Sequence, residues 1–344
     1  TLILWRSSSQ WIGGLYFLFF LIIIFSSKQF NYKMISLTYS GDNNFNSKEN
    51  IKDNIFKIFI YYCILSFSLF ILFNISGVRL FNSLNLSMTL ISSGGFLPTD
   101  LLTNIIKTNL QKIILIFSLF IAMLNFYLIF NLFNKKILIR EHKEDFYLLL
   151  LSVILIFFVY FNKNSGIDLI ISILSSLSNS GLTLMQSDNL SLYFLFITII
   201  GGSLISNTSG VKLTRFYILL KIASSEIIKL ISPNSIINKS IFNSEKKITD
   251  ENVKISFLIF ISFFLSLFIL SSFLVLDNIG FEKSFKLSIL TLTNTVNSEL
   301  FNMENLNFSN LLTSSKISLI IFMIVGKIEL ISFFLIFKKI LFKD

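Results

Sequence analysis

Charged residues, cysteine and histidine are all scarce in this chain of 344 residues. Only 14% of the residues are charged, and there is one cysteine and one histidine. A single cysteine, Cys63, excludes an intrachain disulfide, and we expect it to pack inertly in its apolar run. His142 lies in a solvated charged run without a second histidine, which excludes a zinc or haem site. With no clustered acids, histidines or cysteines, we expect neither an enzyme nor an organic cofactor.

Apolar residues are abundant instead. They make up 53% of the sequence, and the mean hydropathy is +0.76, far above the values of soluble proteins. Several segments approach the roughly 20 apolar residues that cross a bilayer as a helix. The sequence therefore predicts an all-α integral membrane protein. The expected spans are Trp11–Phe25, Ile55–Phe73, Ile113–Phe133, Phe146–Phe161, Leu190–Leu220, Ile255–Val275 and Ser315–Phe342.

The net charge of +10 comes from 29 basic and 19 acidic residues. Basic residues concentrate in segments 28–57, 135–143, 215–254 and 338–343, and the connections between them hold few. Such alternation follows the positive-inside rule, so we place the basic segments in the cytoplasm. Because this distribution makes no single basic face, we expect membrane lipid and not nucleic acid as the partner of these charges.

Three short apolar runs lie between predicted spans. Leu80–Ile91 is too short to cross a bilayer, although both flanking spans have their near ends on the outer side. A half-helix that enters the membrane and returns satisfies this topology, and such backbone is tolerated where protein or a water-filled cavity surrounds it. Ile167–Leu177 and Phe281–Leu292 repeat the pattern. We therefore predict a unit of span, half-helix, polar turn and span that occurs three times.

The polar turns after these half-helices suit a cation. A narrow extended backbone presents carbonyl oxygens that can replace the water around K⁺, and small or hydroxylated residues let such strands approach one another. The C-terminal ends of the half-helices would add partial negative charge. The candidate filter residues are Ser92, Ser93, Gly94, Gly95, Asn179, Ser180, Gly181, Thr295, Val296 and Asn297.

Five motifs in order resemble the Trk/Ktr/HKT potassium transporters, specifically their TrkH- and KtrB-type membrane subunits. Leu4–Gly14 is similar to "LWRSLTQWLGG", Ser92–Phe96 to "STGGF", and Ser178–Leu182 lies where "TTTGF" belongs. Gly201–Arg215 matches "GGSAGSTAGGIKVxR" without a gap, and Met323–Leu330 is similar to "MLLGRLEI".

This resemblance implies a pseudo-fourfold pore of repeats, each a helix, a pore half-helix and a helix, that takes up K⁺ across a bacterial cytoplasmic membrane. It also implies a homodimer and a cytosolic nucleotide-binding ring as regulatory partner. Residues 1–27 would form the second helix of repeat 1. Residues 55–134, 146–222 and 253–344 would form repeats 2, 3 and 4.

The chain departs from the family in two filter loops. It begins after the family's first filter loop, so we expect either a fragment or a degenerate protein. In the last loop Asn297 stands where the family has glycine. Asparagine is the residue other than glycine that best tolerates left-handed backbone angles, so we expect Asn297 to take them.

The segment Gly201–Gly210 is predicted to interrupt its helix, because small and polar residues disfavour continuous helix. The resemblance implies an intramembrane gate here. The alternative is a small-residue packing face for a neighbouring helix. The candidate gate residues are Gly201, Gly202, Ser203, Ser206, Asn207, Thr208 and Gly210.

Lys327 is a cation inside a predicted span, which is costly and usually functional. The family has arginine here, lining the pore beneath the filter. The alternative is a pair with Glu329, which spacing on a helix disfavours. For the whole chain we expect K⁺ uptake. A Na⁺-permeable transporter and a non-transporting membrane subunit remain the alternatives.

Overall fold

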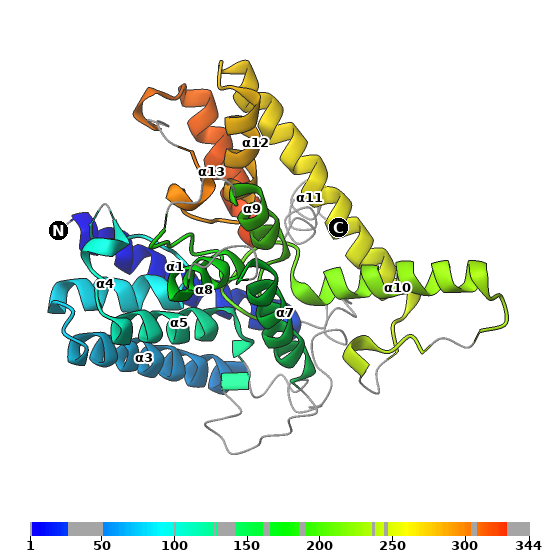
Figure 1. Ribbon diagram of the computed structural model, residues 1–344, viewed down its shortest axis with the longest axis horizontal. Coiled ribbons are helices and arrows are strands. Elements are labelled where there is room, and N and C mark those ends of the chain that lie inside the picture. Colours follow the sequence, from blue (N-terminus) through cyan, green and yellow to red (C-terminus); the bar gives the residue numbers. More distant parts are fainter. Residues whose placement is uncertain are drawn as a thin grey trace.

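The computed structural model describes residues 2–26, 51–99, 101–126, 128–129, 142–160, 166–185, 190–235, 238–243, 247–303 and 308–328. Within these ranges the regular structure is helical, apart from one isolated antiparallel bridge between Ser240 and Lys247. Figure 1 shows the helices as a spread assembly in which α10 projects from the rest. The expectation of an all-α chain is confirmed for the described residues.

The longer helices are the following: α1 (Leu2–Ser26), α3 (Ile51–Ile75), α4 (Leu80–Ile91), α5 (Asn109–Met123), α7 (Lys143–Tyr160), α8 (Gly166–Leu177), α9 (Ser191–Ile200), α10 (Leu213–Ile231), α11 (Asp250–Leu276), α12 (Phe281–Leu292) and α13 (Thr313–Ile328). Short 3₁₀ turns lie between some of them: η3 (Leu102–Asn104), η5 (Ile241–Asn243), η6 (Glu299–Phe301) and η7 (Phe308–Asn310). The predicted helix boundaries of α4 and α12 are confirmed, and α8 begins one residue before the predicted run.

The three 12-residue helices α4, α8 and α12 have equivalent neighbours. Each packs against the helix before it and the helix after it, which gives the groups α3–α4–α5, α7–α8–α9 and α11–α12–α13. Each also packs against the last helix of the preceding group, since α4 contacts α1, α8 contacts α5 and α12 contacts α9. The short helices therefore occupy equivalent places between consecutive groups.

Two predicted spans differ from the structure. The helix expected over Ile113–Phe133 ends at Met123, because Leu124 is extended, with ψ 159°. The helix expected over Leu190–Leu220 is divided into α9 and α10. The last predicted span, to Phe342, can be followed only to Ile328, and Glu329 lies outside the described residues. Within the described residues, two helical segments are long and apolar enough to cross a bilayer on their own, Ile55–Ile75 and Asp250–Leu276.

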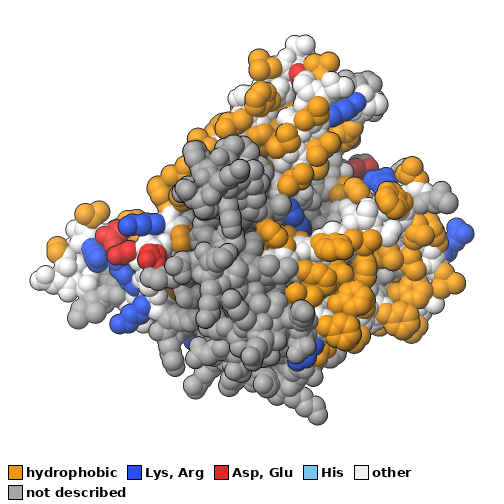
Figure 2. Space-filling model, turned by 180° about the vertical axis from the view of Figure 1, so that it is seen from behind, with side chains coloured by type: hydrophobic (Ala, Val, Ile, Leu, Met, Phe, Trp, Pro, Cys, Tyr) orange, Lys and Arg blue, Asp and Glu red, His pale blue; other side chains and the backbone are white. Residues whose placement is uncertain are grey.

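Much of the surface of the described residues is apolar, and many polar side chains are buried beside a hydrophobic core. Large hydrophobic side chains are exposed along α3, α7 and α11, and Figure 2 shows such side chains gathered at the lower right and in the upper part of the visible face. They include Phe56, Phe67, Phe146, Phe157, Phe257 and Phe268. Many serine and threonine side chains are buried, above all in the short helices and the segments after them. Because soluble monomers rarely expose apolar patches of this extent, the distribution is typical of a protein embedded in lipid.

Candidate functional site

The three short helices end in the same kind of turn. The second residue after each helix has a positive φ: 54° at Ser93, 58° at Asn179 and 52° at Asn294. The N–H of the next residue then donates back to a carbonyl of the helix, with N–O distances of 2.7, 3.0 and 2.9 Å for Gly94, Ser180 and Thr295. This is the left-handed C-terminal cap that satisfies free carbonyls at a helix end. The segments Ser92–Gly95, Ser178–Gly181 and Thr293–Val296 are called the three turns below.

Backbone from different turns comes into close contact where each turn ends. Gly95 and Gly181 have φ values of +73° and +72°. A Cβ atom on Gly95 would lie 1.8 Å from the Ser180 carbonyl oxygen, and one on Gly181 would lie 2.3 Å from the Val296 carbonyl oxygen. A side chain is therefore excluded at both glycines by strain and by space. The structure brings the predicted residues Gly95, Ser180, Gly181 and Val296 together.

In the last turn, the residue that corresponds to Gly95 and Gly181 is not the one that the sequence predicts. Counting from the left-handed residue, Val296 occupies the place that Gly95 and Gly181 hold in the other turns. Asn297 has no positive φ, so the expectation that it takes the left-handed conformation is wrong. The physical reason is that α12 ends at Leu292 and Asn294 supplies the left-handed cap, which sets the register of everything that follows.

Side-chain amides hold the turns to neighbouring helices. The Asn179 Nδ2 donates to the Thr198 carbonyl of α9 at 2.8 Å, and the Asn294 Nδ2 donates to the Met323 carbonyl of α13 at 3.0 Å. In the first turn the donor comes from α1, because the Gln10 Nε2 donates to the Gly94 carbonyl at 2.9 Å. Gln10 was not among the predicted site residues, although it lies inside the motif Leu4–Gly14.

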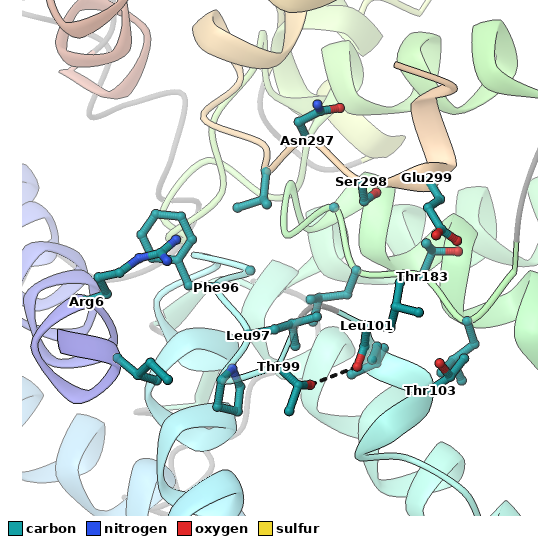
Figure 3. A pocket seen from close by; sticks show the side chains of 18 of the residues that line it. Arg6, Phe96, Leu97, Thr99, Leu101, Thr103, Thr183, Asn297, Ser298 and Glu299 are labelled. Atoms are coloured by element: carbon teal, nitrogen blue, oxygen red, sulfur yellow. Dashed lines mark hydrogen bonds between the residues drawn. The ribbon is translucent and has the colours of Figure 1, made fainter. Parts of the chain in front are cut away.

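A cavity of about 790 Å³ adjoins all three turns (Figure 3). Its lining includes Gly95, Gly181 and Val296, together with Asn297 and Glu299 from the segment after α12. On the α1 side the Arg6 guanidinium lies over the Phe96 ring, 4.2 Å from its centroid. Asn297 thus lies beside the turns and contributes to the cavity wall.

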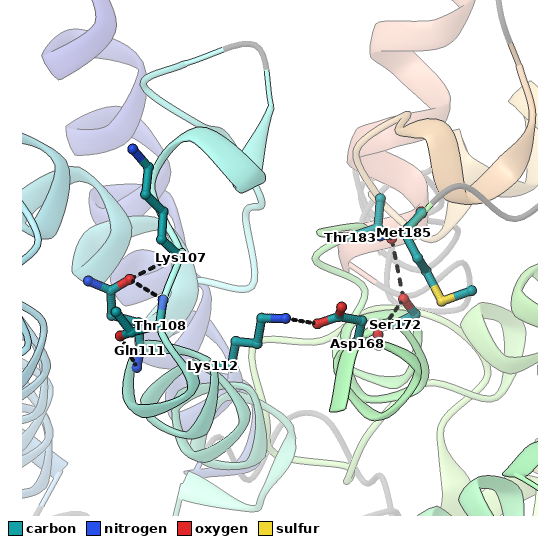
Figure 4. A network of polar contacts seen from close by, with 8 residues as sticks. All are labelled: Lys107, Thr108, Gln111, Lys112, Asp168, Ser172, Thr183 and Met185. Atoms are coloured by element: carbon teal, nitrogen blue, oxygen red, sulfur yellow. Dashed lines mark hydrogen bonds and ion pairs between the residues drawn. The ribbon is translucent and has the colours of Figure 1, made fainter. Parts of the chain in front are cut away.

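Polar contacts also join α5 to α8 (Figure 4). The Lys112 ammonium lies 2.6 Å from the Asp168 carboxylate, at the first turn of α8. The Ser172 and Thr183 hydroxyls are 3.2 Å apart and join α8 to the segment after its turn. The Lys112–Asp168 ion pair thus connects the second and third groups of helices.

The predicted interruption between α9 and α10 is confirmed. Residues 201–212, called the α9–α10 loop, are not helical, and Gly201 and Gly210 have φ values of 69° and 86°. Residues 201–209 are all buried. A Cβ on Gly201 would lie 2.2 Å from the Ser209 carbonyl oxygen, so the loop folds tightly on itself.

The Lys212 ammonium lies inside this loop. It donates to the carbonyl oxygens of Ser203 and Thr208 at 3.2 and 2.5 Å and to the hydroxyl oxygens of Ser206 and Thr208 at 3.3 and 3.0 Å. Lys212 is 2% exposed and has a φ of 74°. Lys212 lies within the motif Gly201–Arg215, but nothing in the spacing of that motif shows that its side chain folds back into the loop.

The loop touches the end of one short helix and the candidate pore charge. The Asn207 Nδ2 donates to the Ile91 carbonyl, the last residue of α4, at 2.9 Å. The Lys327 ammonium donates to the Asn207 carbonyl oxygen and lies 4.9 Å from the centroid of the Phe17 ring. The predicted filter, loop and charge residues therefore form one connected region.

Comparison with known proteins agrees with this architecture. The crystal structure of the potassium transporter TrkH from Vibrio parahaemolyticus matches with a TM-score of 0.77 and 19% sequence identity, over 97% of this chain and 72% of that chain. The chain has the TrkH fold. An uncharacterized cation transporter of Methanocaldococcus jannaschii is 26% identical over 366 aligned positions, which cover all of this chain and 71% of that protein. No protein-family model matches.

These two proteins are a potassium transporter and an uncharacterized cation transporter, which agrees with the expectation that this chain is not an enzyme. Within the TrkH fold of this chain, the three turns meet at the cavity, and the α9–α10 loop lies against the end of α4. In the part of the chain that the structure describes, no group of three or more histidine, cysteine, aspartate or glutamate side chains could hold a metal ion. Backbone carbonyl and hydroxyl oxygens are the ligands that the turns offer.

Proposed function

We propose that this chain forms the pore of a potassium transporter in the cytoplasmic membrane. The observation on which the proposal rests is the meeting of the three turns, where the backbones of Gly95, Ser180, Gly181 and Val296 are in contact beside a cavity. Carbonyl oxygens held this closely can replace the hydration shell of K⁺. The short helices point their C-terminal, partly negative ends into the same region.

The α9–α10 loop is the proposed barrier in this pathway. It is buried, it contacts the end of α4, and its Asn207 carbonyl accepts a hydrogen bond from Lys327. Irregular backbone at membrane depth is stable only when its polar groups are paired, and the loop supplies these pairs through Ser206, Thr208 and Lys212. A packing face would present small side chains to a neighbouring helix, whereas this loop contributes hydrogen bonds from its backbone and polar side chains.

The proposed partners follow from the likeness and from the charge distribution. Exposed apolar side chains on α3, α7 and α11 suit contact with lipid or with a second copy of the chain. The partly exposed Lys221 and Lys229 of α10 and the exposed Lys247 after it suit the cytoplasmic side, where a nucleotide-binding ring would dock. We therefore propose a homodimer regulated from that side.

Uptake of ⁸⁶Rb⁺, a K⁺ substitute, tests the proposal in cells that lack their own K⁺ uptake and express the protein as its gene encodes it. Gly95→Ala and Gly181→Ala should abolish uptake or cation preference, because each new methyl group would collide with a carbonyl oxygen of the neighbouring turn. Gly166→Ala is the matched control, because nothing lies within 4 Å of a Cβ there. Unchanged uptake and preference in both turn variants would remove the turns from the pathway.

A Na⁺-permeable transporter is a second candidate, favoured by Val296. In the turn Thr293–Val296, this residue stands where the other two turns have glycine, and its backbone φ is not positive. A turn that differs in this way holds its carbonyl oxygen differently from the other two, which weakens discrimination by size. Competition of Na⁺ with ⁸⁶Rb⁺ in the same uptake assay separates the two candidates.

A further inference from the structure

Two helices are broken in the described structure, and the breaks lie next to each other. The first separates α5 from the residues after Met123, and the second is the α9–α10 loop. Each break leaves backbone N–H groups without a partner inside its own helix. Because these groups are buried, each needs an acceptor from elsewhere.

Backbone hydrogen bonds between the two breaks pair some of these N–H groups. The Ser203 N–H of the loop donates to the Met123 carbonyl at 3.0 Å, and the Phe126 N–H donates to the Ile205 carbonyl at 2.8 Å. A Cβ on Gly202 would lie 2.8 Å from the same Met123 oxygen, so the two backbones are in direct contact. The loop and the residues after α5 are therefore joined in both directions by backbone hydrogen bonds.

Two neighbouring carboxylates on the first turn of α7 accept further N–H groups of the same breaks. The Asp145 Oδ1 accepts from the Asn125 N–H at 2.8 Å, at the break in α5. The Glu144 Oε1 accepts from the Leu204 N–H at 2.8 Å, in the loop. The same Glu144 oxygen accepts from the Thr214 hydroxyl at 2.6 Å, at the start of α10.

We propose that Glu144 and Asp145 are positioning residues that hold the α9–α10 loop in its blocking position, and that the loop and the chain after Met123 move as one unit. This rests on the proposed function of the loop. The pair has this effect because it tethers two breaks and the start of α10 to one rigid helix end. Opening must then displace both breaks together, or disrupt the hydrogen bonds between them.

Matched substitutions separate hydrogen-bond acceptance from charge. Glu144→Gln keeps an acceptor oxygen at the same place, whereas Glu144→Met keeps the length of the side chain and removes the acceptor. Asp145→Asn and Asp145→Leu make the same comparison at the other break. We measure ⁸⁶Rb⁺ flux into liposomes that contain the purified protein, with no cytosolic partner, and monomer or dimer integrity by gel filtration.

Glu144→Met and Asp145→Leu should raise the basal ⁸⁶Rb⁺ flux severalfold with an unchanged Rb⁺ to Na⁺ flux ratio, while Glu144→Gln and Asp145→Asn stay near the wild type. The double variant Glu144→Met/Asp145→Leu should exceed neither single variant by much, because both act on one unit. Equal effects of the amide and apolar variants, or fully additive effects, would overturn the proposal. No flux in the wild type and in every one of these variants would instead count against the proposed function.

A cross-link tests the shared motion without depending on the stability of those variants. Phe126→Cys/Ile205→Cys, in a background with Cys63→Ser, places two thiols beside the hydrogen bond between the breaks. If the breaks move together, oxidation should form the disulfide and leave ⁸⁶Rb⁺ flux unchanged. A flux that stops on oxidation and returns on reduction would overturn the proposal, because it would show that the loop moves alone.

Discussion

At the scale of single residues, close packing singles out Gly326 on α13. A Cβ added there would lie 2.1 Å from the Leu292 carbonyl oxygen and 3.0 Å from the Leu292 Cα atom, so α13 crosses the end of α12 only because position 326 has no side chain. Gly326→Ala should lower the free energy of unfolding by about 1–3 kcal/mol, the usual cost of overpacking.

Thermal unfolding of the detergent-purified protein measures this effect as a lower midpoint. Gly13→Ala on α1 is the matched control, because nothing lies within 4 Å of a Cβ there and alanine favours helix. Equal midpoints for Gly326→Ala and the wild type would mean that the two helices can separate at no cost.

Val296 is the residue at which the register of the last turn can be tested. Val296→Gly should increase discrimination between Rb⁺ and Na⁺, because it gives the turn Thr293–Val296 the glycine that the other two turns have at the corresponding position. Asn297→Gly is the control, since it substitutes glycine at the position that the sequence alone had favoured. Rb⁺ uptake in competition with Na⁺ measures the discrimination of both variants. A larger effect of Asn297→Gly would mean that position 297, and not position 296, corresponds to the glycines of the other two turns.

The same turns show how far residues can be assigned without a structure. Gly95 and Gly181 were predicted because glycine is the residue that allows a left-handed backbone at a crowded place. Asn297 was misplaced because two asparagines compete for the cap after α12, and only the point at which that helix ends decides between them. Contacts such as Gln10 with Gly94 join residues 84 positions apart, and no local pattern predicts them.

At the scale of elements, the short helices were predictable and one helix end was not. The apolar runs of α4 and α12 are bounded by polar turns, so length and composition define them. The end of α5 at Met123 lies within the mostly apolar run Ile113–Phe133, in which the polar residues Ser118, Asn125 and Asn131 do not mark where the helix ends. This break is stable because Asp145 and Ile205 accept its N–H groups, and both acceptors are distant in sequence.

Lys212 tests the α9–α10 loop as an element. Lys212→Met should destabilise the loop, because it leaves buried carbonyl oxygens of the loop without their ammonium donor, at a cost of roughly 1–3 kcal/mol for each group that stays unpaired. We expect a lower unfolding midpoint and a raised ⁸⁶Rb⁺ flux in the absence of a partner. Lys229→Met on the exposed part of α10, which removes only a contact with Glu226, should change neither quantity. Identical behaviour of the two variants would show that the buried ammonium contributes nothing to the loop.

At the scale of the whole molecule, burial is arranged as expected for a protein that carries ions through lipid. Phenylalanine and isoleucine side chains lie outside on α3, α7 and α11, while hydroxyl groups and the charged residues Lys212 and Arg215 are buried. In water such an arrangement would expose apolar surface and bury polar groups at a cost on both counts. In a bilayer the apolar exterior costs nothing, and the buried polar groups can line a pathway.

Orientation in the membrane is the last property that can be argued from this distribution. The cavity beside the three turns, lined by Thr99, should face outward, whereas α10 with Lys229 should face the cytoplasm, because basic segments stay inside. In intact cells a membrane-impermeant thiol reagent should label Thr99→Cys and leave Lys229→Cys unlabelled, and both should react after the cells are opened. Both variants carry Cys63→Ser, so that the reagent reports one position. Labelling of Lys229→Cys from outside would reverse the orientation and place the α9–α10 loop on the outer side of the turns, where a cytosolic partner could not act on it.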